Sequence, residues 1–378
     1  PMKTEVDINT DILSWAIERA GYDVREFEVK FPKVSEWLEK QKKPTVRQLE
    51  DFARKVHLPF GYLLLDEPPE EEVPIPFFRT YQTRTDKVSL NVYDTILLYQ
   101  KRQQWLQQYF RDNDFDKPDF VGRFKGETDF RTIVKDIRAE LNLNTEWAGN
   151  QPNWEKALDH LTQLVENKGI IVAFNGVVGN NTKRPIPVEE CRGFVLVDDT
   201  APFMFVNSRD SKAAQMFTIA HELGHIWTGK SAGFDFRQMQ PAGDANEKLC
   251  DKIAAELLVP EDIFIQKWAA TNDFKTLARH FKVSPIVVAR RALDTGKISK
   301  TAFFSFYNNY LEDVRDKKNR QESGGDFYKT AKKRLSRRFL THVDRAVREN
   351  YLLVRDAYHL TGLKGSTFRE LMSNQLYS

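Results

Sequence analysis

The sequence contains very little cysteine and no long apolar segment. Only two cysteines, Cys191 and Cys250, occur in 378 residues, which is too few for a disulfide framework and suits a reducing cytosol. No apolar run approaches the roughly 18–20 residues that a membrane-spanning helix needs. The N-terminal residues 1–7 lack the apolar core of a secretory signal. We therefore expect a soluble, cytoplasmic protein.

The chain also carries little net charge. It has 57 Lys and Arg residues against 54 Asp and Glu residues, so its formal net charge is +3. This balance excludes a protein that coats polyanions with its whole surface, but it does not exclude a local charged patch. Hydrophobic residues make up 41% of the chain and aromatic residues 12%, so we expect packed cores rather than disorder. The length predicts two or three domains, and we find no internal repeat and no Gly-rich phosphate loop.

Helical periodicity dominates the chain, with one β-rich stretch near its middle. Apolar residues recur at helical spacing before residue 65 and again at about residues 90–111, 129–141 and 154–167. The period changes to that of strands at residues 169–174, 194–197 and 203–206, and helical spacing returns from Ser211 onward. This order predicts an α+β fold that is mostly helical. A small sheet packs with a zincin-like helix, and N- and C-terminal helical modules flank both.

The segment 213–227 contains the pattern His-Glu-x-x-His, at His221, Glu222 and His225. Residues four apart lie on one face of a helix, so both imidazoles can bind one tetrahedral Zn²⁺ ion. Glu222 follows the first histidine and can reach a water on the metal as a general base. Zinc lowers the pKa of such a water toward about 7 and polarises the scissile carbonyl. The alternative is a pair of structural histidines on a helix face, without a metal.

A catalytic zinc site needs three protein ligands and an open position. The helix expected at residues 247–259 offers several candidates for the third ligand. Glu247 and Asp251 share a face of this helix, so one can bind the metal while the other holds an imidazole N–H. We favour Glu247 as the zinc ligand and expect Asp251 to hold the imidazole N–H of a zinc-binding histidine. Cys250 has apolar neighbours and is expected to pack in the core, and Glu256 is expected to cap a helix or form a structural pair.

Three further segments, at residues 205–210, 214–220 and 254–260, occur in this order around His221. Together they resemble the ImmA/IrrE metallopeptidase family, over about residues 150–300. The resemblance implies a gluzincin-like zinc peptidase that cuts transcriptional repressors of the XRE type to switch on phage, mobile-element or stress genes. It also implies that the third zinc ligand is Glu247. Asp251 departs from the pattern, because the family often has Asn at this position.

The resemblance also suggests how a substrate is held. The strand expected at Phe203–Val206, with Phe203 and Phe205 on one face, could lie at the edge of the sheet and pair with an extended peptide. An ordinary core strand is the alternative. No residue stands out from the sequence as the one that stabilises an oxyanion.

Two segments are candidates for helix-turn-helix units. The N-terminal segment resembles the XRE family through Trp37, Pro44 and the helix Thr45–Val56, but acidic and basic residues balance over residues 1–65. No phosphate-seeking field is therefore evident, and a retained fold with weakened or lost DNA binding is an open alternative. The second candidate spans Leu277 to Leu293, with a turn at residues 282–284. It could grip the substrate or simply support the zinc domain by packing.

Basic residues predominate between Arg315 and Arg348, and aromatic residues interleave with them. A solvated helix face is the usual meaning of such a run, but a surface for nucleic acid or an acidic partner is also credible. The candidate contact residues are Lys332, Lys333, Arg334, Arg337 and Arg338.

We predict the following organisation: an XRE-like domain at 1–65, a linker at 66–76, a helical connector at 77–149, a zinc peptidase domain at 150–270, a helix-turn-helix-like unit at 271–300 and a basic helical region at 301–378. The resemblance places this combination in bacteria, where XRE and ImmA/IrrE modules occur together.

Two functions follow as hypotheses. The first is a zinc metalloendopeptidase, active or latent, that cleaves a regulatory protein such as an XRE-type repressor and so controls a mobile-element, stress or toxin-antitoxin locus. The second is a non-proteolytic DNA-binding regulator or antitoxin that binds a PIN-type toxin, with a latent or structural zinc site. The presence of Glu222 favours the first, because a purely structural site does not need a base.

Overall fold

The computed structural model describes residues 4–71, 77–78, 88–230, 232–234, 245–318 and 327–376. The chain divides into two compact units, a smaller one at residues 1–74 and 85–94 and a larger one at residues 75–84 and 95–378. The end of the expected linker, residues 72–76, and part of the expected connector and basic region lie outside the described residues. Within the described chain, no helix combines the length and apolarity that a bilayer-crossing segment requires.

The smaller unit is helical, and capping side chains begin most of its helices. Asn9, Asp23 and Thr45 each accept a hydrogen bond from a backbone N–H of the first turn that follows them. Phe27 lies at the centre of the core, where its ring contacts the rings of Phe31 and Phe52 among others. The helices are α1 (Thr10–Arg19), α2 (Val24–Lys30), α3 (Pro32–Leu38), α4 (Val46–Lys55) and the 3₁₀-helix η1 (Phe60–Leu64).

The segment before α3 forms the short helix α2. Asp23 caps α2, and the large ring of Phe27 fills the space inside the unit. The resemblance of this unit to XRE domains stays a prediction.

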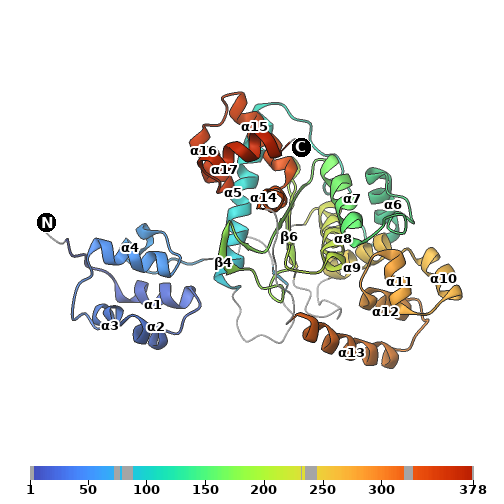
Figure 1. Ribbon diagram of the computed structural model, residues 1–378, viewed down its shortest axis with the longest axis horizontal. Helices are drawn as coiled ribbons and strands as arrows, with labels where there is room; N and C mark the ends of the chain where they lie inside the picture. The colour runs from blue at the N-terminus through green and yellow to red at the C-terminus, as the bar shows by residue number, and fades with distance from the viewer. Residues whose placement is uncertain are drawn as a thin grey trace. The chain divides into compact units, whose positions relative to one another are not determined.

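The larger unit contains a five-stranded sheet with the strand order β1-β7-β5-β6-β2 and a separate two-stranded pair, β3-β4 (Figure 1). β2 and β6 are parallel, whereas β5 is antiparallel to both β6 and β7. The strands are β1 (Phe77–Phe78), β2 (Ile171–Asn175), β3 (Val177–Val178), β4 (Asn181–Pro185), β5 (Gly193–Leu196), β6 (Phe203–Asn207) and β7 (Ala232–Phe234).

Helices cover both faces of this sheet, so the predicted fold class, α+β and mostly helical, is confirmed. The helices are α5 (Leu90–Asp112), α6 (Phe130–Leu141), α7 (Trp154–Asn167), α8 (Lys212–Thr228), α9 (Ala245–Leu258), α10 (Glu261–Ala270), α11 (Phe274–Phe281), α12 (Pro285–Asp294), α13 (Lys300–Lys318), α14 (Phe327–Leu335), α15 (Arg337–Arg348), α16 (Val354–Thr361), α17 (Gly365–Glu370) and the π-helix η2 (Leu371–Gln375).

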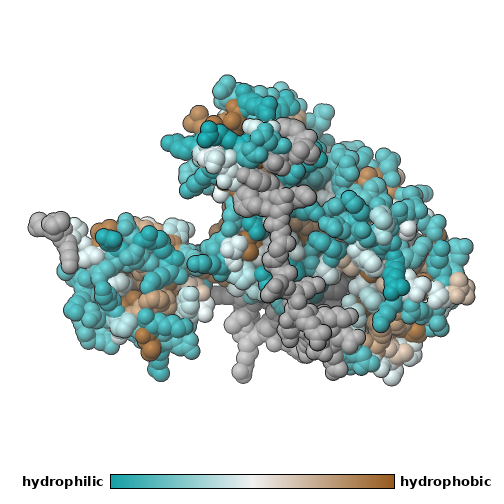
Figure 2. Space-filling view, viewed as in Figure 1, coloured by the Kyte–Doolittle hydropathy of each residue, from teal (hydrophilic) through white to brown (hydrophobic). Residues whose placement is uncertain are grey.

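The two faces of β6 pack against different helices, because successive side chains of a strand point to opposite faces. Met204 and Val206 belong to the core shared with α7, α8 and α9. Phe203 and Phe205 point the other way, where the ring of Tyr99 from α5 contacts both of them. In Figure 2, hydrophilic residues cover most of the visible surface and apolar ones form scattered patches, as expected when apolar faces point inward.

The prediction that Phe203–Val206 lies at the edge of the sheet is wrong. β6 pairs with β2 on one side and with β5 on the other, so β6 itself offers no free edge that a peptide could join. Phe203 and Phe205 are also completely buried and cannot contact a substrate. The alternative interpretation, an ordinary core strand, is the correct one.

Helices α11 and α12 form the expected pair, joined at residues 282–284 with Lys282 in the left-handed conformation. Their buried side chains, which include Leu277, Val283 and Val288, belong to the same hydrophobic core as α8 and α9. The pair therefore supports the sheet-and-helix domain by packing, as one of the two interpretations predicted. A role in gripping a substrate stays a prediction.

A buried histidine in α15 makes the stability of the larger unit depend on pH. Burial, together with the charges of Arg338 and Arg345, lowers the pKa of His342 from 6.5 to about 4, and the rings of Phe110 and Phe115 surround it. The unfolded chain therefore takes up a proton before the folded one does as the pH falls. The contribution of neutral His342 to the free energy of unfolding is therefore complete above about pH 6.5. It falls by about 3 kcal/mol as the pH is lowered toward 4.

We expect the variant His342→Gln to lose less stability than the wild type between pH 6.5 and pH 4, because glutamine does not titrate. Urea unfolding of both proteins at several pH values measures this loss. The carboxylates that titrate in the same range contribute equally to both proteins, so their effect cancels in the difference. Parallel curves for the two proteins would contradict the assignment.

Candidate metal centre

Helix α8 carries the His-Glu-x-x-His pattern through the interior of the larger unit. The side chain of Ser211 caps its start by accepting a hydrogen bond from the backbone N–H of Ala214, and Gly229 ends it in the left-handed conformation. Every residue from Gln215 to Thr228 is buried, because α8 packs against the sheet on one side and against α6, α7 and α9 on others. The two histidines and Glu222 are therefore held on a fully enclosed helix.

Three donor groups from α8 and α9 converge on one point. Nε2 of His221 lies 3.1 Å from Nε2 of His225, and the two oxygens of Glu247 lie 3.2 Å and 3.0 Å from these two nitrogens, respectively. A tetrahedral zinc ion with bonds of about 2.0–2.1 Å holds its donors about 3.3 Å apart. The donor separations, and the combination of two imidazoles with one carboxylate, therefore fit a zinc ion.

The electrostatics of His221 and Glu247 also favour a positive charge between them. Burial opposes protonation of His221, but hydrogen bonds to Asp251 and Glu247 raise the pKa of His221 to about 10. Burial likewise opposes ionisation of Glu247, but hydrogen bonds from the two histidines lower the pKa of Glu247 to about 2. A positive charge is thus favoured between His221 and Glu247, whereas burial lowers the pKa of His225.

Cys250 is the competing third donor. Its sulfur and the two imidazoles could in principle hold an ion, since the donor atoms lie within 4.8 Å of one another. The oxygens of Glu247 lie 3.2 Å and 3.0 Å from the two imidazole nitrogens, and burial raises the pKa of the Cys250 thiol well above its ordinary value, which disfavours the thiolate that binds metal. Cys250 instead packs against Gly224, where a Cβ atom would lie 3.0 Å from the sulfur. We therefore favour Glu247, as the sequence did.

Both imidazoles also contact polar side chains through their outer nitrogens, Nδ1. Nδ1 of His221 lies 3.0 Å from Oδ1 of Asp251, whose side chain is one-third exposed. Nδ1 of His225 lies 3.1 Å from the side-chain amide of Asn246. Such partners orient metal-binding imidazoles and set which ring nitrogen carries the proton. The sequence predicted Asp251 and missed Asn246, although an amide directly before Glu247 was an available signal.

Glu222 lies beside the donor groups and is completely buried. Neither of its carboxylate oxygens has a hydrogen-bond partner among the residues that the structure describes. Burial is the main cause that raises the pKa of Glu222 well above its ordinary value, and the charge of Glu247 adds to the effect. A buried carboxyl group beside the donor groups is placed to exchange a proton with a water molecule there.

The backbone of β5 comes close to α8 at Gly193, beside Glu222. A Cβ atom at Gly193 would lie 2.4 Å from a methyl group of Thr218 and 3.7 Å from Oε1 of Glu222. Only glycine allows this approach, so Gly193 sets the distance between the sheet and the motif helix.

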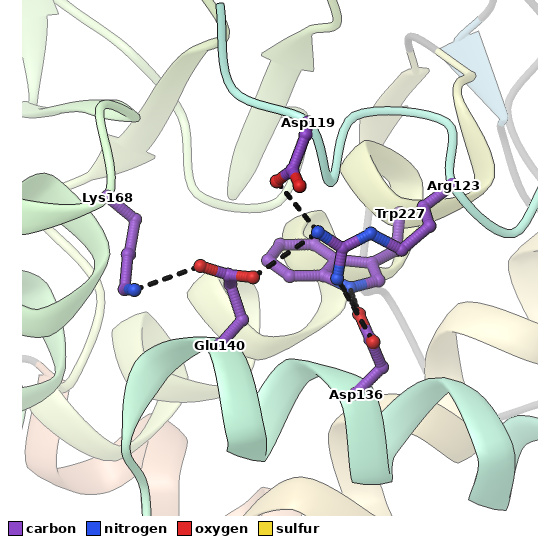
Figure 3. Close-up of polar contacts among 6 residues, drawn as sticks. All are labelled: Asp119, Arg123, Asp136, Glu140, Lys168 and Trp227. Carbon is purple, nitrogen blue, oxygen red and sulfur yellow. Dashed lines mark hydrogen bonds and ion pairs between the residues drawn. The ribbon is translucent and has the colours of Figure 1, made fainter.

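A polar network holds the last turn of α8 (Figure 3). The indole Nε1 of Trp227 donates to Oδ2 of Asp136 at 2.8 Å, and Arg123 pairs with the same carboxylate at 2.8 Å. The remaining members extend the network through ion pairs with Arg123 or with one another: Asp119, Glu140 and Lys168. In addition, the backbone N–H groups of Gly122 and Phe124 donate to the last carbonyls of the helix. The turn that carries His225 is therefore fixed from outside the site.

Glu256 has the structural role that the sequence predicted. Its carboxylate pairs with Arg291 of α12, and Arg138 donates to its backbone carbonyl at 3.2 Å. It takes no part in the group of donors around His221.

The five basic residues proposed as partner contacts do not form one solvated face. Arg338 donates to the backbone carbonyl of Glu166 at 2.9 Å, and Lys333 pairs with Asp159 at 3.1 Å. Arg337 is exposed, whereas Lys332 and Arg334 are partly buried. A nucleic-acid or partner contact at these residues stays a prediction. It is least favoured for Arg338, because this side chain already bonds within the fold.

Two parts of the chain match known protein families. Residues 182–293, which contain the donor residues and Glu222, match the IrrE N-terminal-like domain of the M78 peptidases. The match indicates a metallopeptidase-type domain related to the ImmA/IrrE family. Residues 335–374 match a domain of unknown function, DUF8813. No curated protein matches the chain.

Proposed function

We propose that this protein is a zinc-dependent endopeptidase in which His221, His225 and Glu247 bind the metal and Glu222 is the general base. The observation that carries the proposal is the convergence of two imidazoles and one carboxylate, 3.0–3.2 Å apart, beside a buried carboxyl group without a hydrogen-bond partner in the described chain. The peptidase match over residues 182–293 supports the same reaction.

In this proposal, Asp251 and Asn246 orient the zinc ligands and Glu222 transfers the proton. Asp251 and Asn246 lie against the outer nitrogens of the histidines and keep their inner nitrogens directed at the metal position. When bound there, zinc polarises the scissile carbonyl and makes water more acidic. Glu222 takes the proton from the water that attacks the carbonyl and then passes it to the departing amine.

The proposed substrate is a regulatory protein such as a transcriptional repressor. The family resemblance favours this class, and the peptidase match is consistent with a protein substrate. A locus that encodes a mobile element, a stress response or a toxin-antitoxin pair is the setting we propose for this cleavage.

Metal removal tests the proposal directly. The purified full chain is expected to hold one zinc ion per molecule, to lose peptide-bond hydrolysis when a chelator removes it, and to recover when zinc is restored. Elemental analysis measures the metal, and mass spectrometry of a proteome-derived peptide library measures cleavage. A chain that takes up no zinc from excess zinc solution would contradict the proposal, and so would cleavage that survives complete metal removal.

A further inference from the structure

The metal centre is fully enclosed in this conformation of the chain. His221, Glu222 and His225 are 0% exposed, and Glu247 is 2% exposed. A zinc ion that acts on a peptide bond needs one coordination position for water or substrate, and the scissile bond must come within reach of the base. A peptide substrate can therefore reach the centre only after part of the chain has moved away.

The strand β5 shows which part of the sheet lies next to the base. A Cβ atom at Gly193, the first residue of β5, would lie 3.7 Å from Oε1 of Glu222. On one side, Gly193 pairs with Val206 of the interior strand β6. On the other side it pairs, in antiparallel register, with Phe234 of β7. Because neighbouring strands lie about 4.8 Å apart, the backbone at Phe234 passes beside the residue that lies against the base.

The opposite end of the sheet is covered. β2 is the outer strand there, and β6 separates it from β5. Every residue of β2 is buried, and helix α14 packs against the strand. An extended peptide that adds to the sheet near Glu222 must therefore take the position beside β5, which β7 fills in this structure.

The strands β7 and β1 are short, so few backbone bonds hold them in this position. β7 has three residues, and its register covers three of the four residues of β5, Gly193 to Val195. β1 has two residues and adds to the outer side of β7, with Phe78 opposite Phe234. A peptide strand that spans all of β5 can form more ladder hydrogen bonds with it than β7 does.

The chain reaches β1 from the smaller unit. β1 belongs to residues 75–84, which are part of the larger unit, whereas the chain before and after this segment, residues 1–74 and 85–94, belongs to the smaller one. The pairing with β7 is thus made by a short excursion of the chain, and it can be removed without shortening any helix of the larger unit.

We propose that β7, covered on its outer side by β1, is an inhibitory strand that fills the substrate position beside β5 and must leave before a peptide bond is cleaved. This inference rests on the proposed peptidase function and specifies its substrate: an extended segment of at least about four residues that replaces β7 on β5. Loss of β1 frees the outer side of β7 and makes the exchange easier.

Two variants loosen the inhibitory strand without changing a metal ligand. In the first, a Gly-Ser segment of equal length replaces residues 75–84, which removes β1 and keeps the chain continuous. In the second, Gly233→Pro removes a backbone N–H from the middle of β7. Thr182→Pro makes the same kind of change in β4, an exposed strand of the separate two-stranded pair, and serves as the control. Circular dichroism checks the fold of each variant.

Access to the metal centre gives a readout that does not depend on cleavage. When excess chromophoric chelator is added to the zinc-loaded full chain, we expect both variants to release zinc at least about tenfold faster than the wild type and Thr182→Pro, because local opening becomes easier. Hydrogen–deuterium exchange should also rise at the amides of residues 193–196 that bond to β7, and this measurement needs no zinc.

Cleavage of the peptide library tests the inhibition itself. Both variants should cleave with kcat/KM at least about tenfold above the wild type, because a larger fraction of molecules is open to substrate. The inference is overturned if zinc release and exchange in both folded variants match the wild type. It is also overturned if the variants release zinc faster but cleave more slowly, since β7 would then help to hold the substrate. Faster zinc release without cleavage by any form would refute the peptidase function and still identify β7 as the strand that closes the centre.

Discussion

The variant Glu222→Gln is expected to retain its zinc and to lose almost all peptide-bond hydrolysis. Glutamine has nearly the same shape as glutamate, and residue 222 does not belong to the three donors that converge at 3.0–3.2 Å. The amide cannot accept the proton of the attacking water, however, so kcat should fall by about 10²–10⁴-fold. Buried Glu222 lacks a hydrogen-bond partner in the described chain, and the neutral amide should therefore leave stability the same or slightly higher.

The matched measurements are zinc content, thermal unfolding and cleavage of the peptide library by wild type and variant side by side. Asp262→Asn, which changes an exposed carboxylate on α10, serves as the control and should preserve zinc and cleavage. Unchanged cleavage by Glu222→Gln would exclude the general-base role. A wild type that binds zinc but cleaves nothing, and that shares a bound partner with Glu222→Gln, would favour the non-proteolytic regulator or antitoxin instead.

The variant Glu247→Gln is expected to lose most of its zinc affinity, whereas Cys250→Ala is expected to keep it. Changes to groups that merely orient a ligand cost about 10–100-fold in metal affinity, so removing the charge of a direct donor should cost at least about a hundredfold. Cys250 lies against Gly224 and contributes packing. Its loss should therefore lower the unfolding temperature and leave the zinc affinity nearly unchanged.

Competition with a chromophoric chelator gives the dissociation constants of the two variants, and thermal unfolding of the metal-free proteins gives their stabilities. Retained zinc affinity in Glu247→Gln together with lost affinity in Cys250→Ala would make the thiol the third donor. In metal-free protein, Glu247→Gln also removes the carboxylate that holds protonated His221. Its unfolding temperature should therefore fall when no metal is present.

Much of this protein could be predicted from short stretches of sequence, because local chemistry decides local structure. The spacing of His221 and His225 places both rings on one helix face whatever surrounds it, and the family motifs around them are also continuous in the sequence. The start of α8 at Ser211 likewise follows from a capping residue and its neighbours. The β-rich runs near residues 171–175 and 203–207 were recognisable as strands for the same reason.

The order of the strands could not be predicted in this way. Phe203–Val206 reads as a strand in any sheet, but its neighbours β2 and β5 decide that it is an interior one. Pairing between strands depends on how the whole chain closes, which a short pattern does not contain. The prediction of a substrate-binding edge failed at this step.

The sequence by itself determined the motif helix with His221, Glu222 and His225 on it, and the residues of α9 from which a third donor could come. Only the tertiary structure decided that Glu247 lies within 3.2 Å of both imidazoles, and that Asn246 lies against the outer nitrogen of His225. The physical reason is that a helix fixes which residues share its own face, whereas the packing of helices against one another and against the sheet fixes which faces meet.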